Sequence, residues 1–218
     1  DVNLFRFENV IAVFQSLIDP DFEFFQFFDD CYAPNEFHYF LAAAIKTGHI
    51  VITTNFDCLI ERAMLDIGIE LENIIPVITD EDFQSFHDHD ELIKKGKFPL
   101  YKIHGSLSNF TTGESTKSSV VIGLSDLVGV SIDEQLKCDL NQIRLFESAL
   151  QNRNLILMGY SGSDDYDNNP SLKLIHNIKN IYWIDHAKQT KSMIEYSTRT
   201  LLEDETLYTK EEVEKRHR

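Results

Sequence analysis

The sequence is poor in several features that define whole classes of protein. Its three cysteines are Cys31, Cys58 and Cys138, and none belongs to a CxxC pair, which argues against a disulfide framework and a four-cysteine zinc site. We therefore expect no metal and a reducing, cytoplasmic setting. No stretch approaches the roughly 18 consecutive apolar residues of a membrane span, and no signal peptide is recognisable.

Positive charge is also scarce. Lysine and arginine number 20 against 36 aspartates and glutamates, which gives a formal net charge of −16. This balance argues against direct nucleic-acid binding by the chain. A dinucleotide is still compatible with it, because backbone amides at a helix N-terminus can hold phosphates. The length of 218 residues and the hydrophobic content of 43% are sufficient for one ordered core.

The chain is organised around the stretch His49–Asp57. Its short apolar run, residues 50–52, is rich in β-branched side chains and predicts a buried, central strand of a parallel sheet. Thr54, Asn55 and Asp57 follow its carboxyl end, where open α/β sheets bind ligands. Either Asn55 or Asp57 is also expected to cap the helix that follows.

Later stretches repeat the pattern of a short strand that ends in a polar turn. His104 closes a strand that begins at Pro99, and Gly105 behind it lets a ligand or another backbone segment approach closely. Gly159 and Ser161 follow the strand over residues 154–158. Asp185 ends a further strand and could hold a ribose hydroxyl, as acids do in dinucleotide sites.

Other stretches have ordinary structural interpretations. The phenylalanine-rich residues 1–33 predict aromatic packing against a helical layer. A helix should begin after Asn35 and end at Gly48, with His38 in a packing or capping role. Residues 79–97 predict a solvated loop with a short helix.

Two more elements are expected from local pattern. The apolar run over residues 74–78 contains Pro76, which has no N–H to donate, so this run predicts an edge strand or an irregular segment. Residues 132–152 carry apolar side chains at helical spacing and predict an amphipathic helix.

Taken in order, the strand-end turns resemble those of the SIR2 family. The resemblance runs from about residue 30 to residue 186, and the form of Thr53–Asp57 looks like the SIR2-like branch of prokaryotic anti-phage defence proteins. The matching stretches are residues 34–38, 53–57, 102–105 and 159–161.

The resemblance implies an α/β fold with a Rossmann-like parallel sheet flanked by helices and a small helical N-terminal part. It divides the chain into a helical, Phe-rich part over residues 1–49, a Rossmann-like NAD-binding core over residues 50–186, and a C-terminal helix with a charged tail over residues 187–218.

The resemblance also implies a role for each strand-end residue, with NAD⁺ as the substrate. The catalytic residues would be Asn55 and Asp57 on the nicotinamide-ribose side and His104 as the general base. Imidazole can exchange a proton near neutral pH, and the amide of asparagine both donates and accepts hydrogen bonds. The cofactor-binding residues would be Thr53, Thr54, Asn55, Asp57, Gly159, Ser161 and Asp185.

Two departures from the family pattern shape the expected function. The glycine-rich phosphate loop should precede the phenylalanine-rich stretch, and it is not in this sequence. The interval between His104 and Gly159 holds Cys138 but not the four zinc cysteines of protein-deacylating sirtuins, so water is the expected acceptor.

The expected function is hydrolysis of NAD⁺ to nicotinamide and ADP-ribose by the effector domain of an anti-phage defence protein. The expected partners are NAD⁺ and other domains or subunits of a defence assembly, in a homo-oligomer. A sirtuin-like protein deacylase and a non-catalytic module that binds NAD or ADP-ribose remain open as alternatives.

Overall fold

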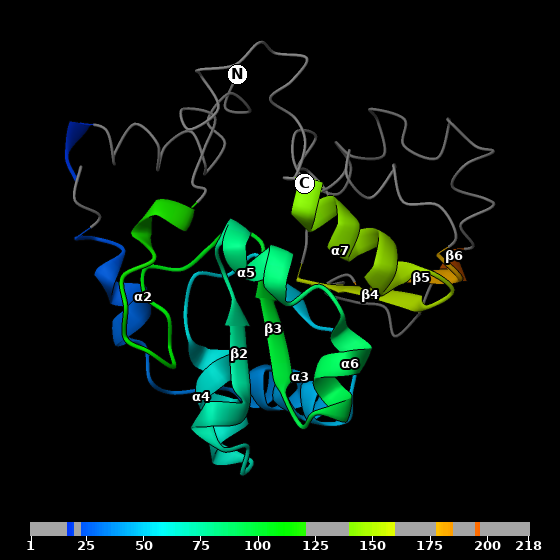
Figure 1. The fold of residues 1–218 in the computed structure, drawn as a ribbon. Coiled ribbons are helices and arrows are strands. Elements are labelled where there is room, and N and C mark those ends of the chain that lie inside the picture. The colour runs from blue at the N-terminus through cyan, green and yellow to red at the C-terminus, as the bar shows by residue number, and fades with distance from the viewer. Residues whose placement is uncertain (1–16, 20–22, 121–139, 160–177, 185–194, 197–218) are drawn as a thin grey trace, which may run out of the picture. The chain divides into compact units, whose positions relative to one another are not determined.

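The described residues of the chain, whose computed structural model is shown in Figure 1, form two small sheets. The structure describes residues 17–19, 23–120, 140–159, 178–184 and 195–196. The chain divides into two units, Asp1–Leu145 and Phe146–Arg218, and each contains one of the sheets. The predicted division into residues 1–49, 50–186 and 187–218 stays a prediction.

The sheet of the first unit is entirely parallel and has the order β1-β3-β2. The strands are β1 (Ile52–Thr53), β2 (Ile74–Val77) and β3 (Phe98–Lys102). Among the described strands, β3 rather than β1 therefore occupies the middle. The reason lies in burial, since residues 99–102 of β3 are buried on both faces whereas β1 is only half-buried.

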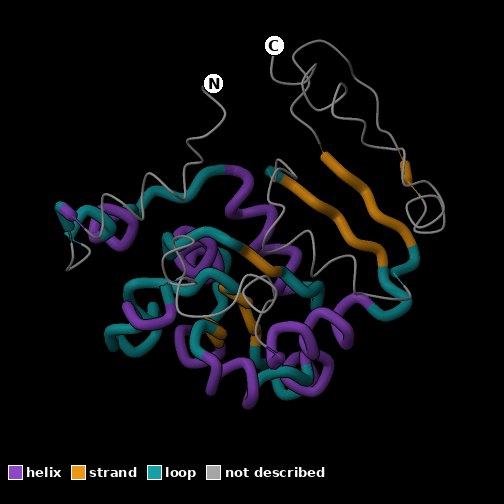
Figure 2. Tube along the Cα trace, turned by 90° about the horizontal axis from the view of Figure 1, so that it is seen from above, coloured by secondary structure: helices purple, strands orange, loops and turns teal. Residues whose placement is uncertain are grey.

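Helices cover both faces of this sheet, as Figures 1 and 2 show. Successive residues of β3 point to opposite faces. Leu100 packs in one core cluster with residues of α3 (Glu36–Lys46) and α4 (Leu59–Asp66). The ring of Tyr101 instead contacts residues of the helices on the other face, α5 (Asp80–Ser85) and α6 (His89–Lys94). The predicted α/β architecture is therefore confirmed.

Local chemistry sets the ends of α3 as predicted. The side-chain oxygen of Asn35 accepts hydrogen bonds from the backbone N–H groups of Phe37 and His38, at 2.9 and 3.3 Å. His38 Nδ1 in return accepts from the Asn35 N–H at 2.9 Å, so this histidine is a capping residue. Gly48 follows the helix with φ +88°, a left-handed conformation that glycine adopts without strain.

The remaining elements of the first unit are short. Of the two forms expected for the run with Pro76, the structure contains the strand, and β2 lies at the edge among the described strands. Residues 79–97 form two short helices, α5 and α6, rather than a loop with one helix, because Thr79 and Asp88 each cap a helix start. The other described elements are α2 (Gln26–Asp30), η2 (Leu71–Asn73) and η3 (Lys117–Ser119).

The second unit contains two parallel strands, β4 (Asn154–Met158) and β5 (Asn180–Ile184), whose register pairs Ile156 with Tyr182. The short strand β6 (Glu195–Tyr196) pairs antiparallel with β5. The helix α7 (Leu140–Leu150) spans the boundary between the units. It confirms the described part of the helix predicted for residues 132–152, and residues 132–139 lie outside the described residues.

Two neighbouring residues of α4 give a direct test of the core. Met64 is fully buried, whereas 37% of Leu65 is exposed. We expect Met64→Ala to lower the free energy of unfolding by about 2–5 kcal/mol, because it leaves a cavity between helix and sheet. Leu65→Ala should cost less than about 1 kcal/mol. Urea unfolding followed by circular dichroism measures both, and equal losses would contradict this packing.

Candidate functional site

The polar turn after β1 is held by its own side chains. Thr53 Oγ1 accepts a hydrogen bond from the Asn55 N–H at 3.1 Å. Asp57 Oδ1 accepts from the Leu59 N–H at 3.0 Å, an Asx turn that leads into α4. The N-cap of α4 is Cys58, whose side chain makes no capping bond, so the prediction that Asn55 or Asp57 is the N-cap was wrong. Thr54 and Asp57 are half-buried, and Asn55 is exposed. The turn thus has a defined backbone and presents the amide of Asn55 at the surface.

The turn after β3 places His104 at the same end of the sheet as the turn after β1, beyond the carboxyl ends of the strands. The strands are parallel and remain paired to their ends, where the Ile103 N–H donates to the Thr53 carbonyl oxygen at 3.1 Å. Asn55 and His104 therefore follow the carboxyl ends of neighbouring strands, the usual place for a ligand in such sheets. The half-buried imidazole of His104 lies with its ring centroid 6.5 Å from that of Phe56.

Gly105 fixes the path of the chain behind His104. Its φ is +79°, and a Cβ atom at this position would lie 2.2 Å from the backbone oxygen of Ser119. The sequence allowed either a ligand or another backbone segment to approach this glycine closely, and in the structure the backbone of Ser119 does so. His104 is therefore held in a turn that no larger residue at position 105 could form unchanged.

The phenylalanine-rich part contributes an aromatic cluster to this edge. Phe25 is buried, and its ring centroid lies 5.7 Å from that of Phe56 and 5.5 Å from that of Phe28. The rings of Phe28 and Phe56 are also in contact, with centroids 6.0 Å apart. Phe56 is thus packed between this cluster and His104.

A buried cation lies beneath the turn, and the sequence analysis missed it. Lys102 Nζ donates to the carbonyl oxygens of Asp57 at 2.7 Å and Phe56 at 3.3 Å. It also forms an ion pair with Glu61 Oε1 of α4 at 3.1 Å, and both side chains are 1% exposed. Burial alone would lower the pKa of Lys102, but the charge and hydrogen bond of Glu61, together with the nearby Cys58 and Asp57, raise that pKa overall.

Cys58 adjoins this ion pair, but its thiol is unreactive at neutral pH. Its Sγ lies 4.0 Å from Lys102 Nζ, and 3% of the residue is exposed. Burial, and to a smaller extent the charge of Glu61, raise the pKa of the Cys58 thiol to about 12. The thiol is therefore protonated at neutral pH and is not a nucleophile.

The predicted residues of the second unit are described only in part. Gly159 directly follows β4, is exposed and has φ +66°, which suits the tight turn expected there. Ser161 and Asp185 lie outside the described residues. The structure thus brings Thr53, Thr54, Asn55, Asp57 and His104 to one sheet edge of the first unit, while Gly159 belongs to the second unit.

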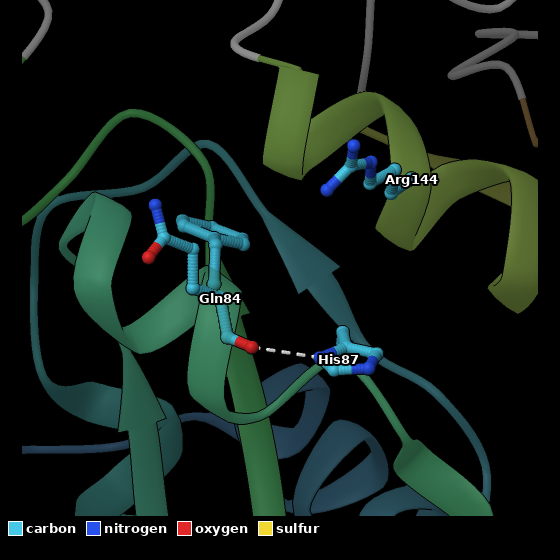
Figure 3. Close-up of a pocket in the computed structure, with 4 residues that line it drawn as sticks. Gln84, His87 and Arg144 are labelled. Atoms are coloured by element: carbon cyan, nitrogen blue, oxygen red, sulfur yellow. Dashed lines mark hydrogen bonds between the residues drawn. The ribbon is translucent and has the colours of Figure 1, made fainter.

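A separate hollow of about 250 Å³ is lined by Phe83, Gln84, His87 and Arg144. Figure 3 shows it, with His87 Nδ1 2.8 Å from the carbonyl oxygen of Gln84 and Arg144 presented from α7. None of the predicted site residues lines it, so it does not enlarge the site at the strand ends.

Within the described residues, no group of three or more His, Cys, Asp or Glu side chains is arranged to hold a metal ion. No helix in the described part of the chain is both long and apolar enough to cross a membrane.

The fold and the site define the class of protein. A parallel sheet with helices on both faces and polar turns at its carboxyl edge is a Rossmann-like architecture. The sequence matches the SIR2-like domain family over residues 49–208, a stretch that contains every predicted site residue, and the chain belongs to this family. SIR2-like domains bind NAD, and their family is usually enzymatic and NAD-dependent. A comparison with curated proteins found no match.

The turn behind His104 can be tested with a matched pair of glycines. Gly113 has a similar φ of +72°, but a Cβ atom there meets nothing within 4 Å. Gly113→Ala should cost about 1–2 kcal/mol of unfolding free energy from backbone strain alone. Gly105→Ala should cost about 1–3 kcal/mol more, because the methyl group displaces Ser119. Equal losses in urea unfolding would argue against the close approach.

The burial of Cys58 predicts its resistance to alkylation. With a pKa of about 12, a thiol at about pH 8 is thiolate in only ~10⁻⁴ of molecules. Iodoacetamide should therefore label Cys31, which is partly exposed, well before Cys58 in the folded chain. Peptide mass spectrometry measures both sites, and the denatured chain is the control. Labelling of Cys58 as fast as Cys31 would contradict the buried position.

Proposed function

We propose that the chain hydrolyses NAD⁺ to nicotinamide and ADP-ribose. The observation that carries this proposal is the pairing of β1 with β3, because it brings the turn of Asn55 and the turn of His104 to one edge of a sheet. In a chain of the SIR2-like family, such an edge is where NAD is expected to lie.

The chemistry requires cleavage of the bond between the nicotinamide nitrogen and the ribose carbon. Nicotinamide leaves with the bonding electron pair, the ribose passes through an oxocarbenium-like state, and the oxygen of water attaches to that carbon as it loses a proton. The amide of Asn55 would orient the water or the ribose. His104 would take the proton from water or from a ribose hydroxyl, a step worth roughly 10²–10⁴-fold in rate.

The other predicted residues would hold the substrate. Asp57 would act at the nicotinamide-ribose side, and the bond from the Leu59 N–H to its Oδ1 supports this by fixing its carboxylate. The remaining proposed contacts to NAD⁺ are Thr53, Thr54, Gly159, Ser161 and Asp185.

Substitution at the two turns tests the catalytic assignment. In the full-length protein we expect His104→Gln to reduce nicotinamide release from NAD⁺ by at least ~100-fold, the lower end for loss of a general base. Asn55→Ala should also reduce this release, because the water or the ribose is no longer oriented. His49→Gln is the matched control, since this exposed histidine precedes β1 at the opposite end of the strand, and it should retain the parent rate. Turnover within a few-fold of the parent in both site variants would contradict the assignment.

The acceptor separates hydrolysis from the alternative activities. The parent should release nicotinamide without any acylated peptide, because water is the proposed acceptor. A strict requirement for an acylated peptide would instead identify a deacylase. Binding of NAD⁺ in calorimetry with no product would identify a binding module.

We also propose that this activity serves anti-phage defence, in the cytoplasm and within a homo-oligomeric assembly that includes other domains or subunits. The resemblance of Thr53–Asp57 to the defence branch supports this role. Infected cells that carry the parent protein should lose NAD⁺ and restrict phage, whereas cells with Asn55→Ala should do neither. Equal restriction by both would contradict a defence role for the site.

A further inference from the structure

We infer that Lys102 and Glu61 are positioning residues, whose buried ion pair holds the turn of Asn55 and Asp57 in place beside His104. The catalytic part of this inference rests on the proposed function. The mechanical part, that the pair anchors the turn, stands on the contacts alone.

The alternation of β3 explains how Lys102 reaches the turn. Leu100 packs against α4, so Lys102, two residues later, points to the same face. There its Nζ meets the carbonyl oxygens of Phe56 and Asp57 on one side and the carboxylate of Glu61 on the other. One cation thus joins strand β3, the turn after β1 and helix α4.

A second donor from the same strand end reaches the same turn. The fully buried Ser106 donates from its Oγ to the carbonyl oxygen of Phe56 at 2.9 Å. Lys102 and Ser106 lie two residues before and two residues after His104. The segment that carries His104 is therefore hydrogen-bonded, before and after the histidine, to the backbone carbonyl groups of Phe56 and Asp57.

Stability alone is a poor explanation for this pair. A buried ion pair often gains nothing over apolar side chains of similar volume, because both charges lose their hydration. Moreover, Glu61 Oε2 is buried and has no hydrogen-bond partner among the residues that the structure describes. What apolar side chains could not supply is a donor to the turn carbonyls, and this is the contact that the pair makes.

Lys97 provides a matched control in the same sheet. It precedes β3 at the opposite end, and its Nζ donates to the Glu72 carbonyl oxygen at 2.8 Å and to Asn73 Oδ1 at 3.0 Å. Loss of this lysine also removes a contact from a lysine to a backbone carbonyl, here in η2, but it does so at the opposite end of β3 from His104.

The test uses the full-length protein with three variants. Lys102→Met/Glu61→Met removes both charges together, so that neither is left buried alone. Ser106→Ala removes the second donor with little change in volume and carries the test if the double variant does not fold. Lys97→Met is the control.

Two measurements are made on each variant. Hydrogen exchange by mass spectrometry reports the amides of residues 54–60, and steady-state kinetics report nicotinamide release from NAD⁺. Exchange in this segment should rise at least about tenfold in the double variant and measurably in Ser106→Ala, with no change in Lys97→Met. The kcat should fall about 10–100-fold in the double variant, while KM changes less than about threefold.

The outcomes separate the two proposals. Unchanged exchange at residues 54–60 in the double variant, or in Ser106→Ala where the double variant does not fold, would overturn the anchoring role. Increased exchange with parental kcat would overturn the catalytic positioning. If the parent protein itself releases no nicotinamide, the proposed function fails, and the exchange data alone then decide whether the pair anchors the turn.

Discussion

The buried ammonium of Lys102 is the constraint on which the first unit depends. A charge in this position must be neutralised and hydrogen-bonded, and it finds those partners in α4 and in the turn after β1. The same arrangement explains the chemistry of Cys58. The nearby lysine would lower the pKa of its thiol, but burial and the charge of Glu61 outweigh that effect. The result is a buried, hydrogen-bonded ion pair next to the polar turn that carries Asn55 and Asp57.

Strand β3 links this interior to the rest of the unit. Its side chains alternate between two faces. Leu100 packs in the α3–α4 core and Lys102 forms the ion pair on one face, and Tyr101 contacts the α5–α6 helices on the other. The turn that follows is equally determined, since the backbone of Ser119 occupies the space beside Gly105. His104 therefore leaves a strand that is packed on both faces. Such support is what a group needs if it is to act on a bound substrate from a fixed position.

The parts of this arrangement that depend on local chemistry, such as helix ends, could be predicted from the sequence. The cap at Asn35, the reciprocal contact of His38 and the left-handed Gly48 follow from short-range rules, and the structure confirms them. Pro76 indicated an edge strand or an irregular segment, and among the described strands β2 lies at the edge. The middle position of β3 was not predicted, because strand order depends on which segments pair across long separations. The burial of Lys102 was also missed, although a lysine inside the apolar run of β3 was a visible signal.

The sequence by itself determined the alternation of strands and helices, the polar residues at the strand ends and the family to which they belong. These features depend on residue type, spacing and order along the chain. The tertiary structure alone decided that β3 separates β1 from β2, that the backbone of Ser119 approaches Gly105, and that Glu61 meets Lys102. Each of these depends on contacts between residues far apart in sequence, and no local pattern encodes which partner a buried strand or charge will find.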